Sequence, residues 1–192
     1  MHLISRMENA MEDKKTSYVR EVRNTIIYFG AIILCVLFIH TFIGHQVKVE
    51  GSSMESTLHN KDHLILEKVT YHFQDPKRFD IVVFRPYNNK KDVYYIKRVI
   101  GLPNERILIE NGNIYINGEL LSENYGNNPM MDGGIASEEI TLGGDEYFLL
   151  GDNRNNSTDS RNSKVGVIKE DSIIGKALIR IWPIQDFGIL NK

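Results

Sequence analysis

An unbroken apolar run follows the first 24 residues, and the chain beyond this run alternates between apolar and polar positions over short stretches. Residues 25–44 read TIIYFGAIILCVLFIHTFIG and contain no charged side chain. A helix needs about 20 such residues to cross the hydrocarbon core of a bilayer. The run therefore predicts one transmembrane helix at residues 25–44. A cleavable leader is the alternative, but its apolar segment would be shorter and would end at a small-x-small site.

The distribution of basic residues around this run predicts its orientation. Lys14, Lys15, Arg20 and Arg23 precede the run, and only Lys48 follows it closely. Lysine and arginine are enriched on the cytoplasmic side of a membrane helix. We therefore expect a cytoplasmic segment at residues 1–24 and an extracytoplasmic domain at residues 46–192.

Beyond the apolar run, the pattern is that of many short β-strands separated by turns. Asn111-Gly112 separates two alternating runs, which is a strong hairpin signal. Strands that short must hide their edges, which favours a mostly β domain with a coiled antiparallel sheet or a barrel-like sheet. A sandwich is the alternative on pattern alone. The expected strands are residues 46–50, 63–69, 80–84, 93–101, 106–110, 113–117, 146–151 and 175–182.

Composition removes several classes of function. The chain has 192 residues, 23 basic and 25 acidic side chains and a formal net charge of −2. This balance provides no positive field for nucleic acid, so we expect no nucleic-acid partner. Cys35 is the only cysteine, which excludes a disulfide framework and a cysteine-based zinc site. His59 and His63 lack a third ligand at metal spacing, so no metal site is predicted.

A serine-rich turn follows the first expected strand, at GSSMESTL in residues 51–58. A strand that ends in glycine can present a hydroxyl group at a turn, beside main-chain N–H groups that are free to bind an oxyanion. Taken alone, the segment also fits a Ser/Gly loop that leads to a short helix capped by Ser53 or Ser56.

A second polar patch lies inside an apolar strand, at VYYIKRVIGLP in residues 93–103. Alternation places Tyr95, Lys97 and Val99 on one face and Ile96 and Arg98 on the other, so either Lys97 or Arg98 must lie near apolar surface. Lys97 could snorkel at a sheet edge. Alternatively, loss of water lowers its pKa and makes the neutral amine available as a general base for a serine.

Two further segments complete the pattern. LLGDNRNNSTDSR at residues 149–161 is an apolar strand that opens into a dense array of hydrogen-bonding side chains, which indicates a supporting loop. It fails as an EF-hand, because Arg154 stands at the third loop position. A plain solvated Asn/Asp loop is the alternative. KRFDIVVFRP at residues 77–86 predicts a buried strand framed by charges.

These segments, in this order, resemble the type I signal peptidases, the Ser/Lys family that includes the bacterial leader peptidases. Residues 51–58 match the pattern G-x-S-M-x-P-T-L, with Ser53 in the place of the nucleophile. Residues 97–104 match K-R-V-I-G-L-P-G, with Lys97 in the place of the base. Residues 151–161 match G-D-N-R-x-x-S-x-D-S-R, and 80–84 match the D-I-V-V-F strand. The likeness runs from the apolar run to Gly175.

The resemblance also shows departures. Ser56 replaces a proline beside the nucleophile, and Asn104 replaces a glycine that needs positive φ, which asparagine tolerates. Gly51 stands where some members carry a hydroxyl group that helps bind the oxyanion. The resemblance therefore implies reliance on the main-chain N–H of Ser53. None of these changes removes a catalytic group.

The resemblance implies a membrane-bound serine endopeptidase of the bacterial cell membrane that removes signal peptides from preproteins through an acyl-enzyme, without metal or organic cofactor. Its partners would be signal peptides and membrane lipid. Ser157 would hydrogen-bond the Lys97 amine, while Asp159 and Arg161 would pair and hold the loop. Shallow pockets for the substrate side chains at −1 and −3 would be lined by Val47, Val49, Met54, Leu58, Tyr95 and Ile96.

Two other functions fit parts of the pattern. A self-cleaving repressor-type peptidase would share the Ser/Lys chemistry, but it would carry a DNA-binding or polymerase-linked segment where this chain has its apolar run. A membrane-tethered β module that binds peptides without cleaving them would need no nucleophile. Cleavage of a preprotein, with Ser53→Ala as control, distinguishes them.

Overall fold

The computed structural model describes residues 2–42, 45–86, 93–126 and 128–190. The chain divides into two compact units, Met1–Phe42 and Ile43–Lys192. The first unit is the helix α1 (His2–Phe42), whose side chains are described for residues 17–37.

The predicted membrane-spanning helix at residues 25–44 is not supported by the described part of the chain. Residues 43–44 and the side chains of residues 38–42 lie outside the described residues. In what remains, no helix combines the length and the apolar composition that a membrane span requires.

The second unit is built on a large antiparallel sheet with the strand order β1-β2-β11-β3-β4-β9-β10, in which β12 also pairs with β11. Register shifts interrupt the pairing of β11 with β2 and with β3, and that of β4 with β9. Such irregularities bend a strand and increase its twist. The strands are β1 (His45–Lys48), β2 (His63–Glu67), β3 (Ile81–Phe84), β4 (Tyr95–Gly101), β9 (Glu146–Leu150), β10 (Ile168–Lys169), β11 (Ile173–Trp182) and β12 (Gly188–Ile189).

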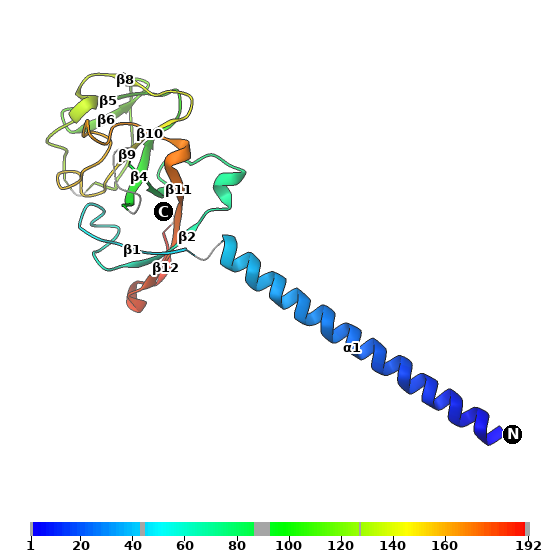
Figure 1. The fold of residues 1–192 in the computed structure, drawn as a ribbon. Helices are drawn as coiled ribbons and strands as arrows, with labels where there is room; N and C mark the ends of the chain where they lie inside the picture. The colour runs from blue at the N-terminus through cyan, green and yellow to red at the C-terminus, as the bar shows by residue number, and fades with distance from the viewer. Residues whose placement is uncertain (1, 43–44, 87–92, 127, 191–192) are drawn as a thin grey trace. The chain divides into compact units, whose positions relative to one another are not determined.

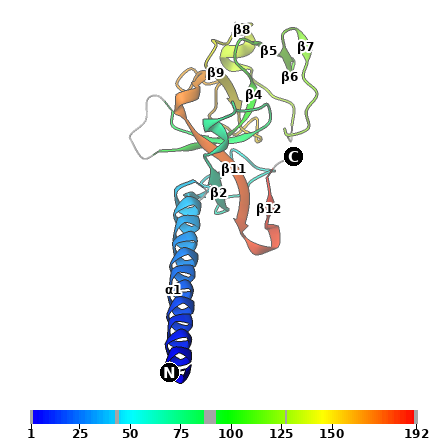
Figure 2. The same ribbon diagram turned by 90° about the vertical axis from the view of Figure 1, so that its right-hand side faces the viewer.

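A smaller antiparallel sheet, in the order β7-β6-β5-β8, lies at the end of this unit opposite β12 (Figures 1 and 2). Its hairpin turns at Asn111 and Gly112, both at positive φ, between β5 and β6 as the Asn-Gly signal predicts. The strands are β5 (Arg106–Glu110), β6 (Asn113–Ile116), β7 (Glu119–Leu120) and β8 (Ile140–Thr141). Short 3-10 helices, η1 (Thr70–His72), η2 (Gly134–Ser137), η3 (Glu170–Ser172) and η4 (Ile184–Asp186), complete the unit.

The prediction of a mostly β domain with a coiled antiparallel sheet is confirmed. Every expected strand is present, and the strand ends differ from the prediction by at most two residues. The structure also contains β7, β8, β10 and β12, which have two residues each. A strand of two residues is too short to show alternation, so the sequence pattern could not reveal these four.

One of the apolar clusters anchors the serine-rich turn. Val49, Met54 and Leu58 are buried together with residues of β2, β3 and β11. Because these three residues flank and follow Ser53, the core fixes the position of the turn on the sheet.

Candidate active site

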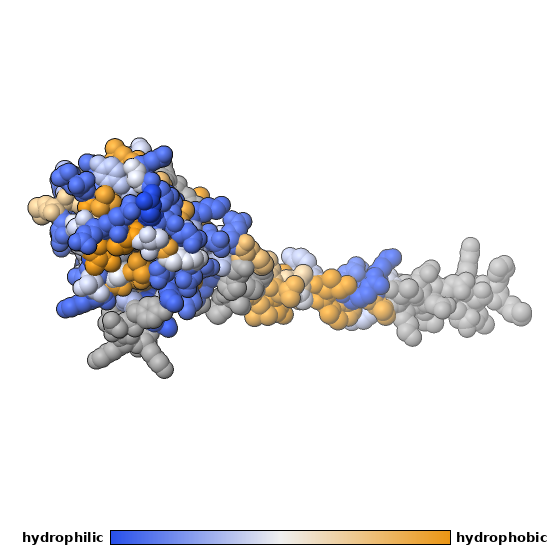
Figure 3. All heavy atoms as spheres, turned by 90° about the horizontal axis from the view of Figure 1, so that it is seen from above, coloured by the Kyte–Doolittle hydropathy of each residue, from blue (hydrophilic) through white to orange (hydrophobic). Residues whose placement is uncertain are grey.

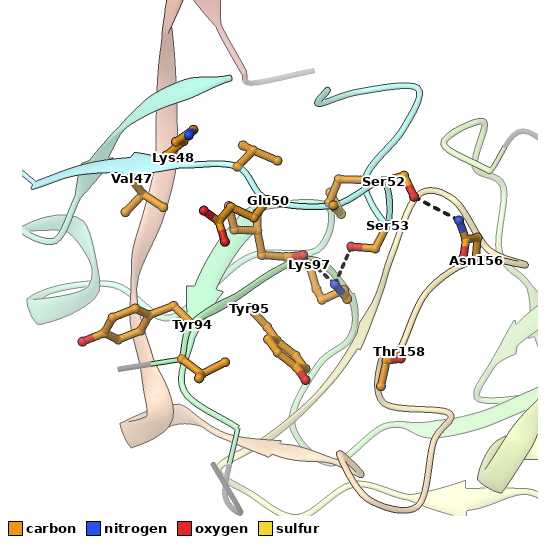
Figure 4. Close-up of a pocket in the computed structure, with 15 residues that line it drawn as sticks. Val47, Lys48, Glu50, Ser52, Ser53, Tyr94, Tyr95, Lys97, Asn156 and Thr158 are labelled. Carbon is orange, nitrogen blue, oxygen red and sulfur yellow. Dashed lines mark hydrogen bonds between the residues drawn. The ribbon is translucent and has the colours of Figure 1, made fainter. Parts of the chain in front are cut away.

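The turn after β1 presents Ser53 through its backbone conformation. Gly51 has φ of +91°, a conformation that side chains other than glycine's rarely adopt, and it turns the chain away from the strand direction. The next two serines then point to different partners. Ser52 Oγ accepts a hydrogen bond from Asn156 Nδ2 at 2.9 Å, whereas Ser53 Oγ lies 2.8 Å from Lys97 Nζ (Figure 4).

Lys97 comes from the middle of β4 and is 4% exposed. Its amine donates a second hydrogen bond, to the carbonyl oxygen of Ile96 at 3.0 Å, and lies 5.4 Å from the ring centroid of Tyr95. The next residue, Arg98, is also buried, at 1% exposed. The sequence required only one of the two to lie near apolar surface, and the structure buries both.

Burial changes the acidity of the Lys97 amine. Loss of water lowers its pKa from 10.5 to about 8, and the nearby carboxylates of Asp159 and Asp152 oppose this shift. At neutral pH about a tenth of the molecules would therefore carry the neutral amine, against fewer than about one in a thousand for a free lysine.

The loop at residues 151–161 holds the serine turn from the other side. The main-chain N–H of Asn153 donates to the carbonyl oxygen of Ser53 at 3.0 Å, and its side-chain Nδ2 donates to the carbonyl oxygen of Ser52 at 3.1 Å. Asn156 adds the contact with Ser52 Oγ. The density of polar side chains in this loop therefore has the supporting role that the sequence indicated.

A buried ion pair joins this loop to β4, and sequence reasoning missed it. Arg98 donates from Nε to Asp152 Oδ1 at 2.8 Å and from Nη2 to Oδ2 at 2.7 Å, and both side chains are at most 1% exposed. Thr57 Oγ1 donates to the same carboxylate at 2.5 Å. The Tyr125 ring covers the guanidinium at 3.7 Å. The pair connects three segments: the serine turn, the lysine strand and the supporting loop.

The three predicted supporting residues differ in outcome. Asp159 and Arg161 form the expected ion pair, with Arg161 Nη2 2.9 Å from Asp159 Oδ2. Asp159 also accepts a hydrogen bond from the N–H of Gly151 at 3.0 Å. The Oγ atom of Ser157, however, is buried without a hydrogen-bond partner in the described residues, so its predicted hydrogen bond to Lys97 is not formed.

Gly151 leaves the space in which these groups meet. A Cβ atom at this position would lie 2.2 Å from Ser157 Oγ and 2.5 Å from the carbonyl oxygen of Ser53. We expect Gly151→Ala to displace the serine turn, to lower turnover and to destabilise the domain by about 1–3 kcal/mol. Thermal unfolding and the cleavage rate measure the two effects.

Gly188→Ala is the control for this change, because a Cβ atom there would meet nothing within 4 Å. Equal melting temperatures and rates for the two alanine variants would contradict the steric argument.

The pocket beside Ser53 has a volume of about 560 Å³ and lies between β1 and the start of β4 (Figure 4). Five of the six predicted substrate-binding residues line it, namely Val47, Val49, Met54, Tyr95 and Ile96. The placement of Leu58 in the pocket is wrong, because this side chain is 0% exposed and belongs to the core beneath the turn. The sequence also missed the polar lining from Glu50, Asn156 and Thr158.

A serine hydroxyl group that is hydrogen-bonded to a buried amine, at the edge of a pocket open to an extended chain, is the arrangement of groups that serine peptidases with a lysine base require. In agreement with this class, residues 22–182 match the family model described as signal peptidase, peptidase S26. The chain belongs to this family of signal peptidases, which are serine endopeptidases.

Curated signal peptidases are similar in sequence to this chain over most of their lengths. The chain is 37% identical to a probable signal peptidase I-2 of Synechocystis sp., over 96% of this chain and 86% of that protein. It is 38% identical to signal peptidase I of Leptolyngbya laminosa, over 95% and 89%. A crystal structure of a signal peptidase I from Enterococcus faecalis shares 34% identity over 54% of this chain and 97% of that one, with a TM-score of 0.45.

Proposed function

We propose that the protein cleaves signal peptides from exported preproteins, with Ser53 as nucleophile and Lys97 as general base. The observation that supports this proposal most directly is the 2.8 Å separation of Ser53 Oγ and Lys97 Nζ. The lowered pKa of the lysine is consistent with it, because only the neutral amine can accept a proton.

The reaction proceeds in two steps. The lone pair of the neutral Lys97 amine takes the hydroxyl proton of Ser53, and Oγ attacks the scissile carbonyl carbon to give a tetrahedral oxyanion. The ammonium then donates this proton to the leaving amino group, the peptide bond breaks and an ester to Ser53 remains. In the second step the amine takes a proton from water, the resulting hydroxide attacks the ester, and Ser53 regains its proton from the ammonium.

The oxyanion needs a hydrogen-bond donor near Ser53. Among the hydrogen bonds of the described residues, none uses the main-chain N–H of Ser53. This group is therefore available to the developing negative charge. Gly51 carries no hydroxyl group that could assist, so the main chain takes the larger share of this work.

Two strand edges are open to the substrate. Among the described residues, β1 is the first strand of the large sheet and pairs with β2 alone. Residues 95–97 of β4 pair with β3 on one side, and the described pairing of β4 with β9 begins at Arg98. An extended peptide can add to such edges through its main chain, with alternate side chains entering the pocket. The resemblance to the family implies that small side chains at −1 and −3 occupy this pocket.

Cleavage of a purified preprotein by the full-length protein tests the proposal, with mass spectrometry of both fragments. One cut at the end of the signal peptide is expected. The same preprotein with tryptophan at −1 should resist cleavage, because the family resemblance implies a requirement for a small side chain at this position. Absence of cleavage, or cuts throughout the mature region, would contradict the proposed function.

The neighbouring serine provides a matched variant. Ser52→Ala is expected to keep turnover within about tenfold of the original, because it removes only the hydrogen bond from Asn156 Nδ2 and no reacting group. Steady-state rates on a signal-peptide substrate check this. If Ser52→Ala is inactive and Ser53→Ala is active, the assignment of the nucleophile is wrong.

We further propose that α1 associates the protein with a bacterial membrane, with residues 1–24 on the cytoplasmic side. Ile26, Ile27, Phe29, Ile33 and Leu34 are each more than half exposed on this helix, and apolar side chains cover much of its described length (Figure 3). An apolar surface of this kind favours lipid over water.

Cell fractionation of the full-length protein tests the membrane proposal. The protein is expected in the membrane pellet after an alkaline wash, which removes proteins bound only by charge, and to be released by detergent. Release by the alkaline wash alone would argue against association through this apolar surface.

A further inference from the structure

The supporting loop contributes one wall of the pocket in addition to its contacts with the serine turn. Asn156 and Thr158 of this loop line the 560 Å³ pocket together with residues of β1 and β4. In Figure 4 these two side chains lie on one side of Ser53, and those of Val47 and Tyr94 lie on the other. The pocket therefore has walls on both sides of the nucleophile.

The hydrogen bonds of the loop fix this wall beside the nucleophile. The main-chain N–H of Asn153 donates to the carbonyl oxygen of Ser53 at 3.0 Å, and Asn156 Nδ2 donates to Ser52 Oγ at 2.9 Å. Thr158 follows two positions later with an exposed side chain. None of the hydrogen bonds among the described residues uses its hydroxyl group. A substitution of Thr158 would thus change the pocket wall without breaking a contact that holds the domain together.

The two parts of a peptide extend from the scissile carbonyl carbon in opposite directions. The resemblance to the family implies that the side chains at −1 and −3 lie between β1 and β4, where Val47 and Ile96 line the pocket. The leaving chain, which begins at +1, then continues on the other side of Ser53. On that side the pocket is lined by the exposed side chains of Asn156 and Thr158.

The alternation of an extended chain indicates which side chain of the leaving chain meets this wall. Successive side chains point to opposite faces, so those at −3, −1 and +2 share one face and the side chain at +1 points away from it. Two residues of an extended chain span about 7 Å. The side chain at +2 therefore points into the same pocket as that at −1, but beyond Ser53, where Thr158 lies.

We propose that Thr158 is a specificity-determining residue for the leaving chain, and that its side chain contacts the substrate side chain at +2 and limits its size. This inference rests on the proposed cleavage of signal peptides. Threonine carries no charge, so the contact selects by volume. A charge placed at this position would make the same contact selective by charge.

The first experiment uses a charge at position 158 to detect the contact. Matched peptides that span the cleavage site carry lysine or glutamate at +2, and two further sets carry them at +1 and at −2. Relative to the original protein, Thr158→Glu should shift the lysine-to-glutamate ratio of kcat/KM at +2 about three- to tenfold toward lysine, and Thr158→Lys should shift it about as far toward glutamate. Both shifts should weaken at about 1 M salt, where charges are screened within about 3 Å.

Thr141→Glu and Thr141→Lys are the matched controls. Thr141 is an exposed threonine at the end of β8 and does not line the pocket. These variants change the net charge equally and should keep the ratios of the original protein. A ratio at +2 that both Thr158 variants leave unchanged, an equal response to the Thr141 variants, or a larger shift at +1 or −2 than at +2 would each overturn the inference.

A second experiment tests the selection by size. Thr158→Trp fills the wall, so kcat/KM for a peptide with phenylalanine at +2 should fall about tenfold or more relative to the same peptide with alanine there. Phenylalanine at +1 should show no such loss, because that side chain points away from the wall. Equal losses at +1 and +2, or no loss at +2, would argue against the contact.

A binding measurement distinguishes failure of this inference from failure of the proposed function. The Kd values of the +2 peptides for the full-length Ser53→Ala variant, with and without Thr158→Glu or Thr158→Lys, should show the same opposite shifts. If no peptide is cleaved but the Kd ratios shift, the proposed cleavage fails and the contact at Thr158 stands. If peptides are cleaved and no ratio shifts, the contact falls and the cleavage stands.

Discussion

Lys97→Arg is expected to abolish cleavage although it keeps a positive charge, with kcat/KM falling at least about 10⁴-fold, as in Lys97→Ala and Ser53→Ala. A guanidinium does not lose its proton in the working range of pH, so it cannot accept the hydroxyl proton of Ser53. The three losses should be similar, and a double variant should be no worse than either single one, because the two groups act as a unit. Single-turnover rates on a signal-peptide substrate measure this.

The pH dependence of the original protein provides a second measurement of the same mechanism. Since the neutral amine is the active form and burial lowers the Lys97 pKa to about 8, kcat/KM should rise with pH through a single ionisation near 8 and then level off. A rate that stays flat from acid to alkaline pH, or an active arginine variant, would leave Lys97 as a structural cation.

The same buried amine should lower stability below pH 8. The unfolded chain holds the proton up to about pH 10.5 and the folded chain only to about 8, so stability rises with pH between these values. The inactive Lys97→Met should therefore be more stable than the original at neutral pH, by up to about 3 kcal/mol, and should lose this advantage above about pH 10.5. Urea unfolding at several pH values tests the sign.

Arg98→Met is expected to destabilise the domain by about 3–5 kcal/mol, the largest stability effect among these predictions. The variant would leave the Asp152 carboxylate buried at 0% exposure, with Thr57 Oγ1 as its one remaining side-chain partner among the described residues. It would also remove the guanidinium that lies against the Tyr125 ring. Urea unfolding at neutral pH measures the free energy.

The double variant Arg98→Met with Asp152→Leu is the control, because replacing both members of a buried ion pair by apolar groups removes the unpaired charge. It should regain part of the lost stability. The activity should stay low, since an apolar contact would replace the hydrogen-bonded ion pair between the loop and the lysine strand. A single variant within about 1 kcal/mol of the original would show that the pair contributes little.

Most elements of the fold could be predicted from short stretches of the sequence. The positive φ of Gly51 and Asn104, and the hairpin at Asn111-Gly112, follow from backbone preferences that a few neighbouring residues determine. The strands of four or more residues could be predicted either from alternation, as in β2 and β5, or from a short apolar run, as in β3, and the structure confirms each of them. Ser53 and Lys97 could be singled out because a serine after glycine and a lysine in an apolar strand are unusual in their local settings.

Contacts between distant segments could not be predicted in the same way. Arg98 and Asp152 are 54 positions apart, and only the pairing of β4 with β9 places them together. Leu58 stands four residues after Met54 in the same turn. The Leu58 side chain faces the core alone, whereas the Met54 side chain also lines the pocket. The orientation of Glu50 likewise depends on how the chain twists after β1.

The open edges of β1 and β4 have a consequence for the range of substrates. Hydrogen bonds made by the main chain are the same for every amino acid except proline, so they hold a peptide without reading its sequence. An enzyme that draws its affinity from such bonds can accept many unrelated polypeptides. It can still cut each at one place, because the few side chains of the pocket near Ser53 select which peptide bond lies at the nucleophile. Breadth of substrates and accuracy of cutting would then come from different atoms, the first from the backbone of two strands and the second from the walls of one pocket.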